Sequence, residues 1–400
     1  MFQAVHLSAK DHMNVEYYQN LLRPLLAPMG LLYGSAMRLR RKLYESGVLS
    51  SWRPDAVTVS VGNIGWGGSG KTPLTSWLLD WARSRGFRSL VLTRGYGARP
   101  EKYPHLVKPG HLAEEAGDEP LMLCRQHPDA TIVVDPERSR GGRWAMERLT
   151  PDLIVLDDGF QHLGVRRDAD LVLLKPEDLA HGWNRVIPGG SWREDATALA
   201  RADAFLMKAA PERFQKMTPF FRQRLLGMDK PVFSFSIVPR GLVRIVDGAR
   251  QERFEPQSYM LVTAVGDSAQ VERTAIRYLG ASPREHLAYP DHHAFTRNDV
   301  RQIEQAAVRR QCSHVLCTPK DAVKLGPMAR EYFWTFDLDV EFGPSWNSRH
   351  ESGGRFEAWW DARFNALSGE LSTLQDTATA NETGQVRKRA GENSDNGQKR

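Results

Sequence analysis

The chain has 400 residues, of which 41% are hydrophobic and 26% are charged, and its formal net charge is +6. These fractions are ordinary for a soluble globular protein, and the length allows two domains or one large domain with extensions. The three cysteines, Cys124, Cys312 and Cys317, exclude a disulfide framework, and no second pair of ligands at zinc spacing accompanies them. We interpret all three as small buried side chains of a protein in a reducing compartment.

Residues 1–53 combine positive charge with leucines and are predicted to form a helical segment. They contain seven Lys or Arg residues against three Asp or Glu residues, which accounts for most of the net charge. Residues 1–16 show no secretory signal. Residues 17–44 are dense in leucine, with Pro24 and Pro28 interrupting the first part and four cations between positions 38 and 42.

The uncharged part of this segment is too short to cross a membrane, which takes about 20 apolar residues. An amphipathic helix lying in the headgroup region of a membrane fits the pattern, and an ordinary helix packed on the core is the alternative. Nucleic acid is disfavoured as a partner, because the cations alternate with leucines rather than with aromatic residues that stack on bases.

A complete phosphate-binding motif, G-x-x-x-x-G-K-[ST], follows. Its residues are Gly65, Trp66, Gly67, Gly68, Ser69, Gly70, Lys71 and Thr72. A β-branched run precedes the motif, and apolar residues at helical spacing follow it, so the glycines stand between a strand and a helix N-terminus, where backbone N–H groups bind phosphate. We expect Lys71 to reach the β- and γ-phosphates of a nucleoside triphosphate and the Thr72 hydroxyl to bind Mg²⁺.

Residues 54–228 are predicted to form the P-loop domain around this motif. Short apolar runs alternate with helical patterns, at 56–61, 89–92, 131–134, 153–156, 171–174 and 204–207. Such a pattern indicates an α/β fold, a P-loop NTPase-type parallel sheet covered by helices on both faces. Ligands in these folds bind at the carboxyl ends of the strands.

Two pairs of acids in this domain are candidates for chemistry. Asp157 and Asp158 end the strand at 153–156, as in a Walker B motif, where a carboxylate binds Mg²⁺ directly or through water. Asp118 and Glu119 lie on a turn bounded by Gly117 and Pro120. Asp118 is a candidate general base for a hydroxyl acceptor, but its spacing alone favours a helix N-cap.

Residues 229–370 are predicted to form a smaller α/β domain. Its expected strands are 232–238, 259–265, 314–317 and 334–340, and its expected helices are 271–279 and 298–309. Asp291, His292 and His293 are either an interacting carboxylate–histidine group or a polar loop with solvated side chains. Residues 371–400 have almost no large apolar side chains and are predicted to be a disordered tail.

Arginines in loops and turns suggest an anionic substrate, since guanidinium groups bind phosphates bidentately. The candidates are Arg94, Arg138, Arg140 and Arg193. A guanine-specificity motif is absent, because Thr318-Pro319-Lys320-Asp321 lacks the required order, and ATP is therefore the preferred nucleotide.

Taken together, the motifs resemble the tetraacyldisaccharide 4′-kinase family of lipid A biosynthesis. The resemblance covers roughly residues 20–345, with matching segments in order at 61–73, 93–97, 117–120, 157–162, 188–194, 290–295 and 318–324. The chain departs from the family pattern at Trp66 and Ser69 in the glycine loop and at Ser191-Trp192, where a Pro-Leu-like pair is usual. None of these departures removes a group that the chemistry requires.

The resemblance implies transfer of the γ-phosphoryl group of ATP to the 4′-hydroxyl of a tetraacylated glucosamine disaccharide 1-phosphate, the lipid A precursor. It implies a Gram-negative bacterium and an enzyme peripheral at the cytoplasmic face of the inner membrane. No obligate protein partner is evident. The remaining alternatives are a soluble P-loop kinase for a small sugar or nucleoside, and an ATP-binding regulatory module without transferase activity.

The resemblance also implies roles for individual residues. Asp118 would be the base, with His292 as its partner and Glu119 in support, and Thr72 with Asp157 or Asp158 would hold Mg²⁺. Because Asp118 and His292 belong to different predicted domains, a joint role is expected to need domain closure over the bound substrates. The substrate-binding candidates are Arg94, Gln161, His162 and Arg193.

Overall fold

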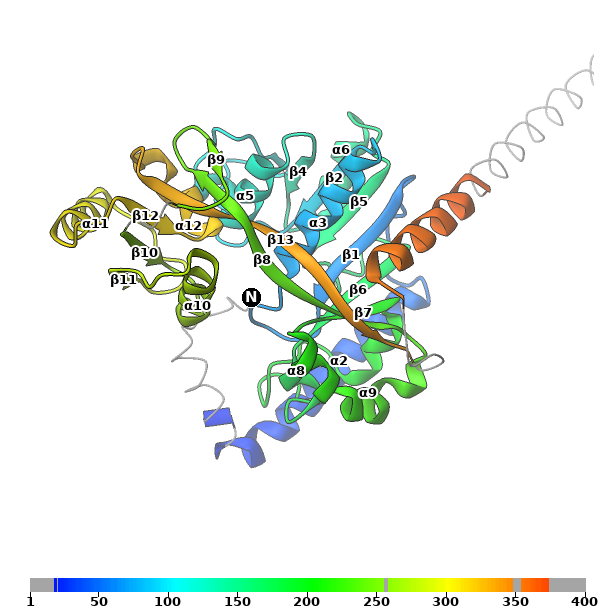
Figure 1. Cartoon of the computed structure of the whole chain (residues 1–400). Coiled ribbons are helices and arrows are strands. Elements are labelled where there is room, and N and C mark those ends of the chain that lie inside the picture. The colour runs from blue at the N-terminus through cyan, green and yellow to red at the C-terminus, as the bar shows by residue number, and fades with distance from the viewer. Residues whose placement is uncertain (1–17, 20, 255–257, 348–353, 374–400) are drawn as a thin grey trace, which may run out of the picture.

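A computed structural model describes residues 18–19, 21–254, 258–347 and 354–373 (Figure 1). It contains one large sheet in which neighbouring strands follow the order β11-β10-β12-β13-β8-β7-β6-β1-β5-β2-β4-β3, and β9 pairs with β8. Helices flank the sheet (Figure 1). The predicted α/β class is therefore confirmed.

The six strands predicted for the first half are all present and pair in parallel. They are β1 (Val57–Asn63), β2 (Ser89–Thr93), β4 (Thr131–Val134), β5 (Leu153–Asp157), β6 (Ala169–Leu174) and β7 (Ala204–Lys208). A two-residue edge strand, β3 (His105–Leu106), pairs antiparallel to β4 and was not predicted. Almost every residue of the six parallel strands is buried, which explains why they are continuous apolar runs in the sequence.

Both faces of this half carry helices, because alternate strand residues point to opposite sides. On one face, Val59 and Val61 of β1 share a hydrophobic cluster with Leu78 of the P-loop helix. On the other face, Leu156 of β5 packs in a cluster with Ala145. The helices of this half are α3 (Lys71–Ser84), α4 (Ala113–Ala116), α5 (Asp118–Gln126), α6 (Arg138–Met146), α7 (Pro176–Leu179), α8 (Pro211–Lys216) and α9 (Thr218–Leu225), with 3-10 turns at Ala196–Arg201 and Leu226–Met228.

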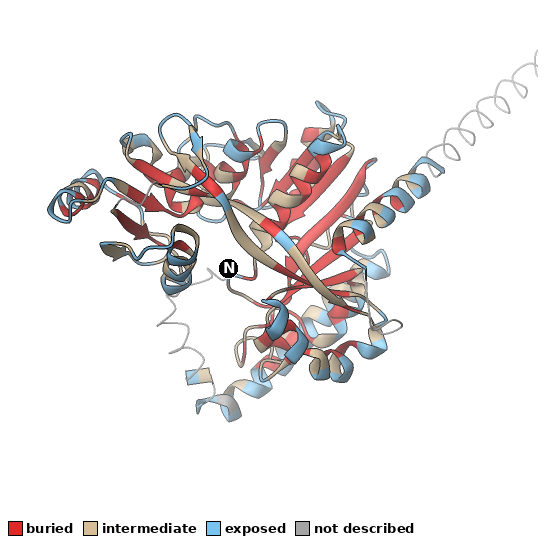
Figure 2. Cartoon of the chain, in the orientation of Figure 1, coloured by how far each residue is buried: buried red, intermediate tan, exposed pale blue. Residues whose placement is uncertain are grey.

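Two long strands join the halves of the sheet. β8 (Val232–Arg244) pairs in parallel with β7, β13 (Phe333–Trp346) pairs in parallel with β12, and β8 and β13 pair antiparallel with each other. They form the ribbon that crosses the centre of the molecule (Figure 1), and much of it is only partly buried (Figure 2). β8 is longer than predicted because it continues through Pro239, which lies opposite Leu338 at a register shift where a missing N–H is tolerated.

The smaller half has the predicted elements, and it also has two strands, at Arg250–Gln251 and Glu285–Ala288, and one helix, at Pro319–Leu325, that were not predicted. Its strands are β9 (Arg250–Gln251), β10 (Tyr259–Thr263), β11 (Glu285–Ala288) and β12 (His314–Cys317), and its helices are α10 (Ser268–Leu279), α11 (Arg297–Arg309) and α12 (Pro319–Leu325), with a 3-10 turn at Gly326–Met328.

The prediction that the cysteines are buried side chains is confirmed for Cys124 and Cys317, but it is wrong for Cys312, which is only half-buried.

A helix at residues 356–373 packs on the first half, although the sequence analysis assigned most of it to the smaller domain. Its Phe356, Trp360 and Phe364 join the same hydrophobic cluster as Trp81 of α3. The Trp81 indole N–H donates to Asp361 at 2.7 Å. The division of the chain at residue 229 remains a prediction, and the predicted tail lies outside the described residues from position 374 onward.

The N-terminal segment contains one long helix, α2 (Arg23–Glu45), which neither proline breaks. Pro24 lies in the first turn, where its missing N–H is not needed, and Pro28 lies inside the helix. One side of α2 faces the protein, since Gly30 and Gly34 are buried against Val186. Among the described residues, no helix combines the length and the apolar composition needed to cross a membrane.

Candidate active site

The candidate residues from the first half gather at the carboxyl edge of the parallel strands. β1 ends at Asn63 and leads into the glycine loop, and β5 ends at Asp157. β2, which pairs with β5, ends at Thr93. The parallel register therefore brings together groups that are far apart in the sequence, as expected for ligand sites of open α/β sheets.

The glycine loop has the backbone shape of a phosphate cradle. Gly67 and Gly70 have φ angles of 98° and 94°, which non-glycine residues rarely adopt, and a Cβ on Gly70 would lie 2.9 Å from the ring of Phe235. The loop is held in place by side chains around it, since Asn63 donates to Ser69 Oγ at 3.1 Å and Lys175 Nζ donates to the Trp66 carbonyl at 3.0 Å.

Lys71 and Asp158 form an ion pair beside this loop. Lys71 Nζ lies 3.4 Å from Asp158 and 3.3 Å from the side-chain oxygen of Asn63. Arg193 donates to both oxygens of Asp158, at 3.1 and 3.0 Å. Burial acts to raise the pKa of Asp158, but Lys71 and Arg193 outweigh it and lower the pKa to about 2. Asp158 is therefore an ionised group that orients two cations.

Asp157 and Glu119 provide a separate set of oxygen ligands. Thr72 Oγ donates to Glu119 at 2.8 Å, and the carboxylate of Asp157 accepts from Thr93 at 3.1 Å. Burial, followed by the charges of Glu119 and Asp158, raises the pKa of Asp157 to about 6. The hydroxyl of Thr72 and the carboxylates of Asp157 and Glu119 suit Mg²⁺, because this ion prefers oxygen ligands. Its positive charge would also offset the repulsion between the two carboxylates. Thr72, Asp157 and Glu119 fit this ion better than Asp158, which is already paired with cations.

The structure brings Asp118 and His292 together across the two halves. Asp118 is the first residue of α5, and its carboxylate lies 3.3 Å from His292 Nδ1. Lys320 Nζ lies 3.0 Å from His292 Nε2 and 3.6 Å from Glu119, and Lys324 Nζ lies 3.9 Å from Asp118. Because the ammonium group can only donate, Nε2 accepts from Lys320 and Nδ1–H donates to Asp118.

This geometry corrects one expectation about Asp118. Asp118 does not cap α5, because Gly117 is the residue before the helix and no side chain makes a cap hydrogen bond there. Asp118 and His292 are in contact in this structure, and domain closure over bound substrates remains a prediction. Burial acts to raise the pKa of Asp118, but the hydrogen bond with His292 and the charges of Lys324 and Lys320 keep the pKa below its ordinary value.

His293 faces a different direction from His292. Its Nε2 lies 3.2 Å from Asp299, and its ring stacks on Tyr289 with the centroids 4.8 Å apart. His292 itself has a φ angle of 60°, so the backbone turns sharply between the two histidines and separates their side chains. Only His292 belongs to the site.

A buried positive region adjoins Asp157 and Asp158. Arg138 is 5% exposed, and its Nε has no hydrogen-bond partner among the described residues. Burial lowers the pKa of Arg138 to about 10, and Asp158 and Asp157 partly oppose that shift. His162 lies in the same field, and burial together with the charge of Arg138 lowers its pKa to about 3. This region can receive an anion without first displacing a carboxylate from Arg138 Nε.

The four substrate-binding candidates do not form one cluster of direct contacts. Gln161 accepts from Arg193 at 3.2 Å and donates to the Asn63 carbonyl at 2.9 Å, so these two residues border the glycine loop. Arg94 is exposed at the end of β2, and its charge is among those that lower the pKa of His162. Arg140, another loop arginine, is bound by Asp135 at 2.8 and 2.7 Å and is not available to a substrate in this arrangement.

The unusual Ser191-Trp192 pair fixes the position of Arg193. The Trp66 N–H donates to the Ser191 carbonyl at 3.1 Å, and the Arg193 N–H donates to the Ile64 carbonyl at 2.7 Å. Trp192 is fully buried, and its indole N–H donates to Asp178 at 3.1 Å. The segment therefore runs along the start of the glycine loop, anchored by a large side chain that the sequence analysis gave no role.

Lys320 and Lys324 are further site residues that the sequence analysis did not assign. Both belong to the segment 318–324, one of those that resemble the family, and Thr318 caps the helix in which they lie. Their spacing of four residues places them on one face of α12, so the signal was present. What the sequence could not show is that this face meets the start of α5.

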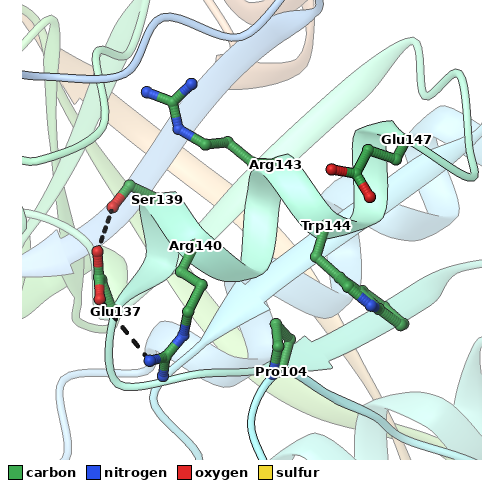
Figure 3. Close-up of a pocket in the computed structure, with 7 residues that line it drawn as sticks. All are labelled: Pro104, Glu137, Ser139, Arg140, Arg143, Trp144 and Glu147. Carbon is green, nitrogen blue, oxygen red and sulfur yellow. Dashed lines mark hydrogen bonds and ion pairs between the residues drawn. The ribbon is translucent and has the colours of Figure 1, made fainter.

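A surface hollow of about 400 Å³ lies on the outer side of α6 and is not this site (Figure 3). Two of its charged residues pair, since Arg140 lies 3.9 Å from Glu137, and Glu137 also accepts from Ser139 at 3.4 Å. No residue of the glycine loop lines it. We therefore base no function on this hollow.

The chain is similar to known proteins over most of its length. A family model described as tetraacyldisaccharide-1-P 4′-kinase matches residues 22–351. Proteins named tetraacyldisaccharide 4′-kinase from Nitratidesulfovibrio vulgaris and Oleidesulfovibrio alaskensis are 48% and 46% identical, over 90% and 88% of this chain and 99% and 98% of theirs. The crystal structure of LpxK from Aquifex aeolicus in complex with ATP is similar with a TM-score of 0.65 and 29% identity, covering 82% of this chain and 95% of that chain.

The depressed pKa of His162 predicts a pH effect on stability. Below about pH 6.5 the unfolded chain protonates this histidine, whereas the folded chain, with a pKa of about 3, does not. The free energy of unfolding should therefore fall as the pH falls through this window, and His162→Gln should remove that loss. Between pH 7.5 and pH 5 we expect the wild type to lose at most about 2 kcal/mol more than the variant, measured by urea unfolding. Identical pH dependence would contradict the assignment.

Proposed function

The chain belongs to the family of tetraacyldisaccharide-1-P 4′-kinases, and we propose that it transfers the γ-phosphoryl group of ATP to the 4′-hydroxyl of tetraacyldisaccharide 1-phosphate. The resemblance drawn from the motifs is thereby confirmed. The observation that carries the proposal is the position of Asp118, hydrogen-bonded to His292, beside the glycine loop: Glu119, the next residue, binds the Thr72 hydroxyl. A phosphate cradle and an ionised carboxylate therefore share one edge of the sheet.

The glycine loop and Lys71 would bind the triphosphate. Backbone N–H groups at the start of α3 favour the β-phosphate, and Lys71 stabilises negative charge on the transferring group. Asp158 and Asn63 hold Lys71 in the loop. Thr72, Asp157 and Glu119 would hold Mg²⁺, which when bound neutralises charge on the phosphate oxygens.

Asp118 would accept the proton of the acceptor hydroxyl. Its lowered pKa keeps the carboxylate ionised at neutral pH, which makes it available but weakly basic. The Nδ1–H of His292 binds one carboxylate oxygen and orients the group, and Lys320 fixes the ring by occupying Nε2. We infer that His292 positions Asp118 rather than taking the proton itself, because its second nitrogen is already engaged.

The positive region around Arg138 would attract the phosphates. Arg138 and Arg94 add positive charge near Asp157 and Asp158. This charge is in addition to that of Lys71 and Arg193, which contact Asp158 directly. Arg193 and Gln161 would line the approach of the sugar at the glycine loop, because they contact each other there.

Helix α2 would bring this site to the membrane that supplies the lipid substrate. A stripe of exposed apolar side chains follows helical spacing along its outer side: Leu25 is 72% exposed, Met29 56%, Leu32 73% and Leu39 59%. The inner side reaches the site, because Arg40 donates to the Gln161 carbonyl at 3.1 Å. An apolar face this large and this close to the site fits an interfacial helix.

Two of the cations of α2 contact the rest of the protein. Arg38 pairs with Asp195 at 3.2 Å, and Arg41 donates to Thr197 at 2.8 Å, so both hold the helix against the protein. Apolar contact, rather than these arginines, would provide most of the membrane affinity. We propose the cytoplasmic face of the inner membrane as the location.

Phosphorylation of the lipid precursor tests the function. Incubated with labelled ATP and the disaccharide precursor in detergent, the wild type should label the lipid, and Lys71→Ala should lower kcat by at least about 100-fold because transfer depends on preorganised charge. Lys216→Ala, an exposed lysine on α8, is the control. Labelling of free sugars or nucleosides instead would favour a small-molecule kinase. ATP hydrolysis unaffected by glycolipid would favour a regulatory module.

Asp118 and His292 should behave as one unit. We expect Asp118→Ala to lower kcat by about 10²–10⁴-fold, as for loss of a general base. The double variant with His292→Ala should be little worse than the poorer single variant, because positioning has no effect once the base is gone. His293→Ala, whose ring faces Asp299, is the matched control and should change kcat little. Effects that multiply in the double variant would mean independent roles.

Loss of apolar area on α2 should weaken membrane binding. Burying one leucine contributes about 1.5–3 kcal/mol, so Leu25→Gln combined with Leu32→Gln should reduce binding to vesicles of phosphatidylglycerol and phosphatidylethanolamine by at least about 10-fold. The matched control is Val308→Gln, since Val308 on α11 is 77% exposed but lies outside the stripe. Vesicle flotation measures the effect, with ATP binding unchanged. Release of the wild type by high salt alone would argue against apolar insertion.

A further inference from the structure

Two histidines and a glutamate lie together between β3 and α4, and we propose that they bind Zn²⁺ or a chemically similar transition-metal ion. His105 lies on β3, His111 in the turn that follows, and Glu115 on α4. One ligand atom from each lies within 4.8 Å of those of the other two. The phosphate-transfer mechanism uses none of these residues.

The distances are close to those of a tetrahedral site. His105 Nε2 lies 3.2 Å from His111 Nδ1 and 3.8 Å from Glu115 Oε1, and His111 Nε2 also lies 3.8 Å from Glu115. With metal–ligand bonds of about 2.0–2.2 Å, neighbouring ligand atoms of a tetrahedral zinc ion are roughly 3.4 Å apart. His111 presents Nδ1 to His105 and Nε2 to Glu115, and Nδ1 also accepts from the Lys108 N–H at 3.3 Å, so the ring of His111 would turn to place one nitrogen at the ion.

The ligand chemistry decides the class of metal. Imidazole nitrogens suit Zn²⁺, Co²⁺, Ni²⁺ and Cu²⁺, whereas Mg²⁺ and Ca²⁺ take oxygen ligands. Two histidines and one carboxylate form a three-ligand set that leaves a fourth position for water. The Glu115 side chain is 41% exposed and those of His105 and His111 are 12% and 21% exposed, so an ion can enter from the side of Glu115.

The backbone that carries the ligands is well supported. β3 pairs with β4, and the Val107 N–H donates to the Ile132 carbonyl at 2.9 Å. Arg125 donates from Nε to the Pro109 carbonyl at 3.0 Å and from its terminal nitrogen to the His111 carbonyl at 3.4 Å. The three side chains therefore project from a fixed frame, which reduces the ordering cost of binding an ion.

The position of the site gives the ion a structural role. Glu115 is on the short helix that ends at Ala116, and Asp118 follows after a single glycine. An ion shared by His105 and Glu115 would tie the edge of the sheet to the turn that leads into α5. Metal binding itself does not depend on the proposed kinase activity, but this clamp would act on the residue that the proposal assigns as the base.

Metal titration tests the site directly. The chain, free of any histidine tag, is stripped with a chelator and titrated with Zn²⁺ against a chromogenic chelator in the absence of nucleotide. We expect one Zn²⁺ per chain in the wild type. Loss of a residue that only hydrogen-bonds to a metal ligand weakens metal binding about 10–100-fold. Because His111 and Glu115 would bind the ion directly, His111→Ala and Glu115→Gln should each weaken binding by at least about 100-fold.

A matched control separates this site from an ordinary histidine–carboxylate pair. His286 Nδ1 lies 3.2 Å from Glu272, but its Nε2 faces the hydroxyl of Thr263 at 2.8 Å rather than another ligand, so His286→Ala should leave Zn²⁺ binding unchanged. Zn²⁺ should also raise the Tm of the wild type but not that of Glu115→Gln. If His111→Ala does not fold, Glu115→Gln and the visible absorption of the Co²⁺-loaded wild type decide. No uptake by the wild type, or equal affinity in Glu115→Gln, would overturn the proposal.

Discussion

A hydrogen bond between Asp118 and His292, 174 residues apart, is the contact on which the site depends. Asp118 starts a helix that packs on the parallel sheet, whereas His292 lies in the smaller half, and the β8–β13 ribbon connects the two (Figure 1). Lys320 and Lys324 on α12 reinforce the contact from the side of the smaller half. Any shift of one half against the other would change the surroundings of the carboxylate.

Burial of like charges governs the rest of the site. Asp157 and Asp158 are adjacent in sequence, yet the pKa of Asp157 is raised to about 6 and that of Asp158 is lowered to about 2. The difference arises because Lys71 and Arg193 face Asp158, whereas Glu119 and hydroxyl groups surround Asp157. Two neighbouring carboxylates thus have different tasks, one as an orienting anion and the other as a candidate metal ligand.

Helix α2 connects the chemistry with the physical state of the proposed substrate. Its inner side contacts Gln161 through Arg40, and its outer side exposes leucines that no described part of the chain covers (Figure 2). Arg38 and Arg41 bind Asp195 and Thr197 and hold this helix against the protein. The expectation of an amphipathic helix and the alternative of a packed helix each describe one side of α2.

The sequence by itself determined the six parallel strands of the first half, the phosphate loop and the acids at the end of β5. These features depend on local patterns, because buried parallel strands are apolar runs and a phosphate cradle requires glycines at fixed spacing. It also singled out Asp118 and His292, although spacing alone favoured a cap for the first and left the second open. Only the tertiary structure decided that these two side chains meet, that Lys320 fixes the histidine and that Glu119 rather than Asp158 joins Thr72. The same holds for the group formed by His105, His111 and Glu115. Such contacts join segments from different elements, and their geometry follows from packing and sheet register, which no local pattern in the sequence encodes.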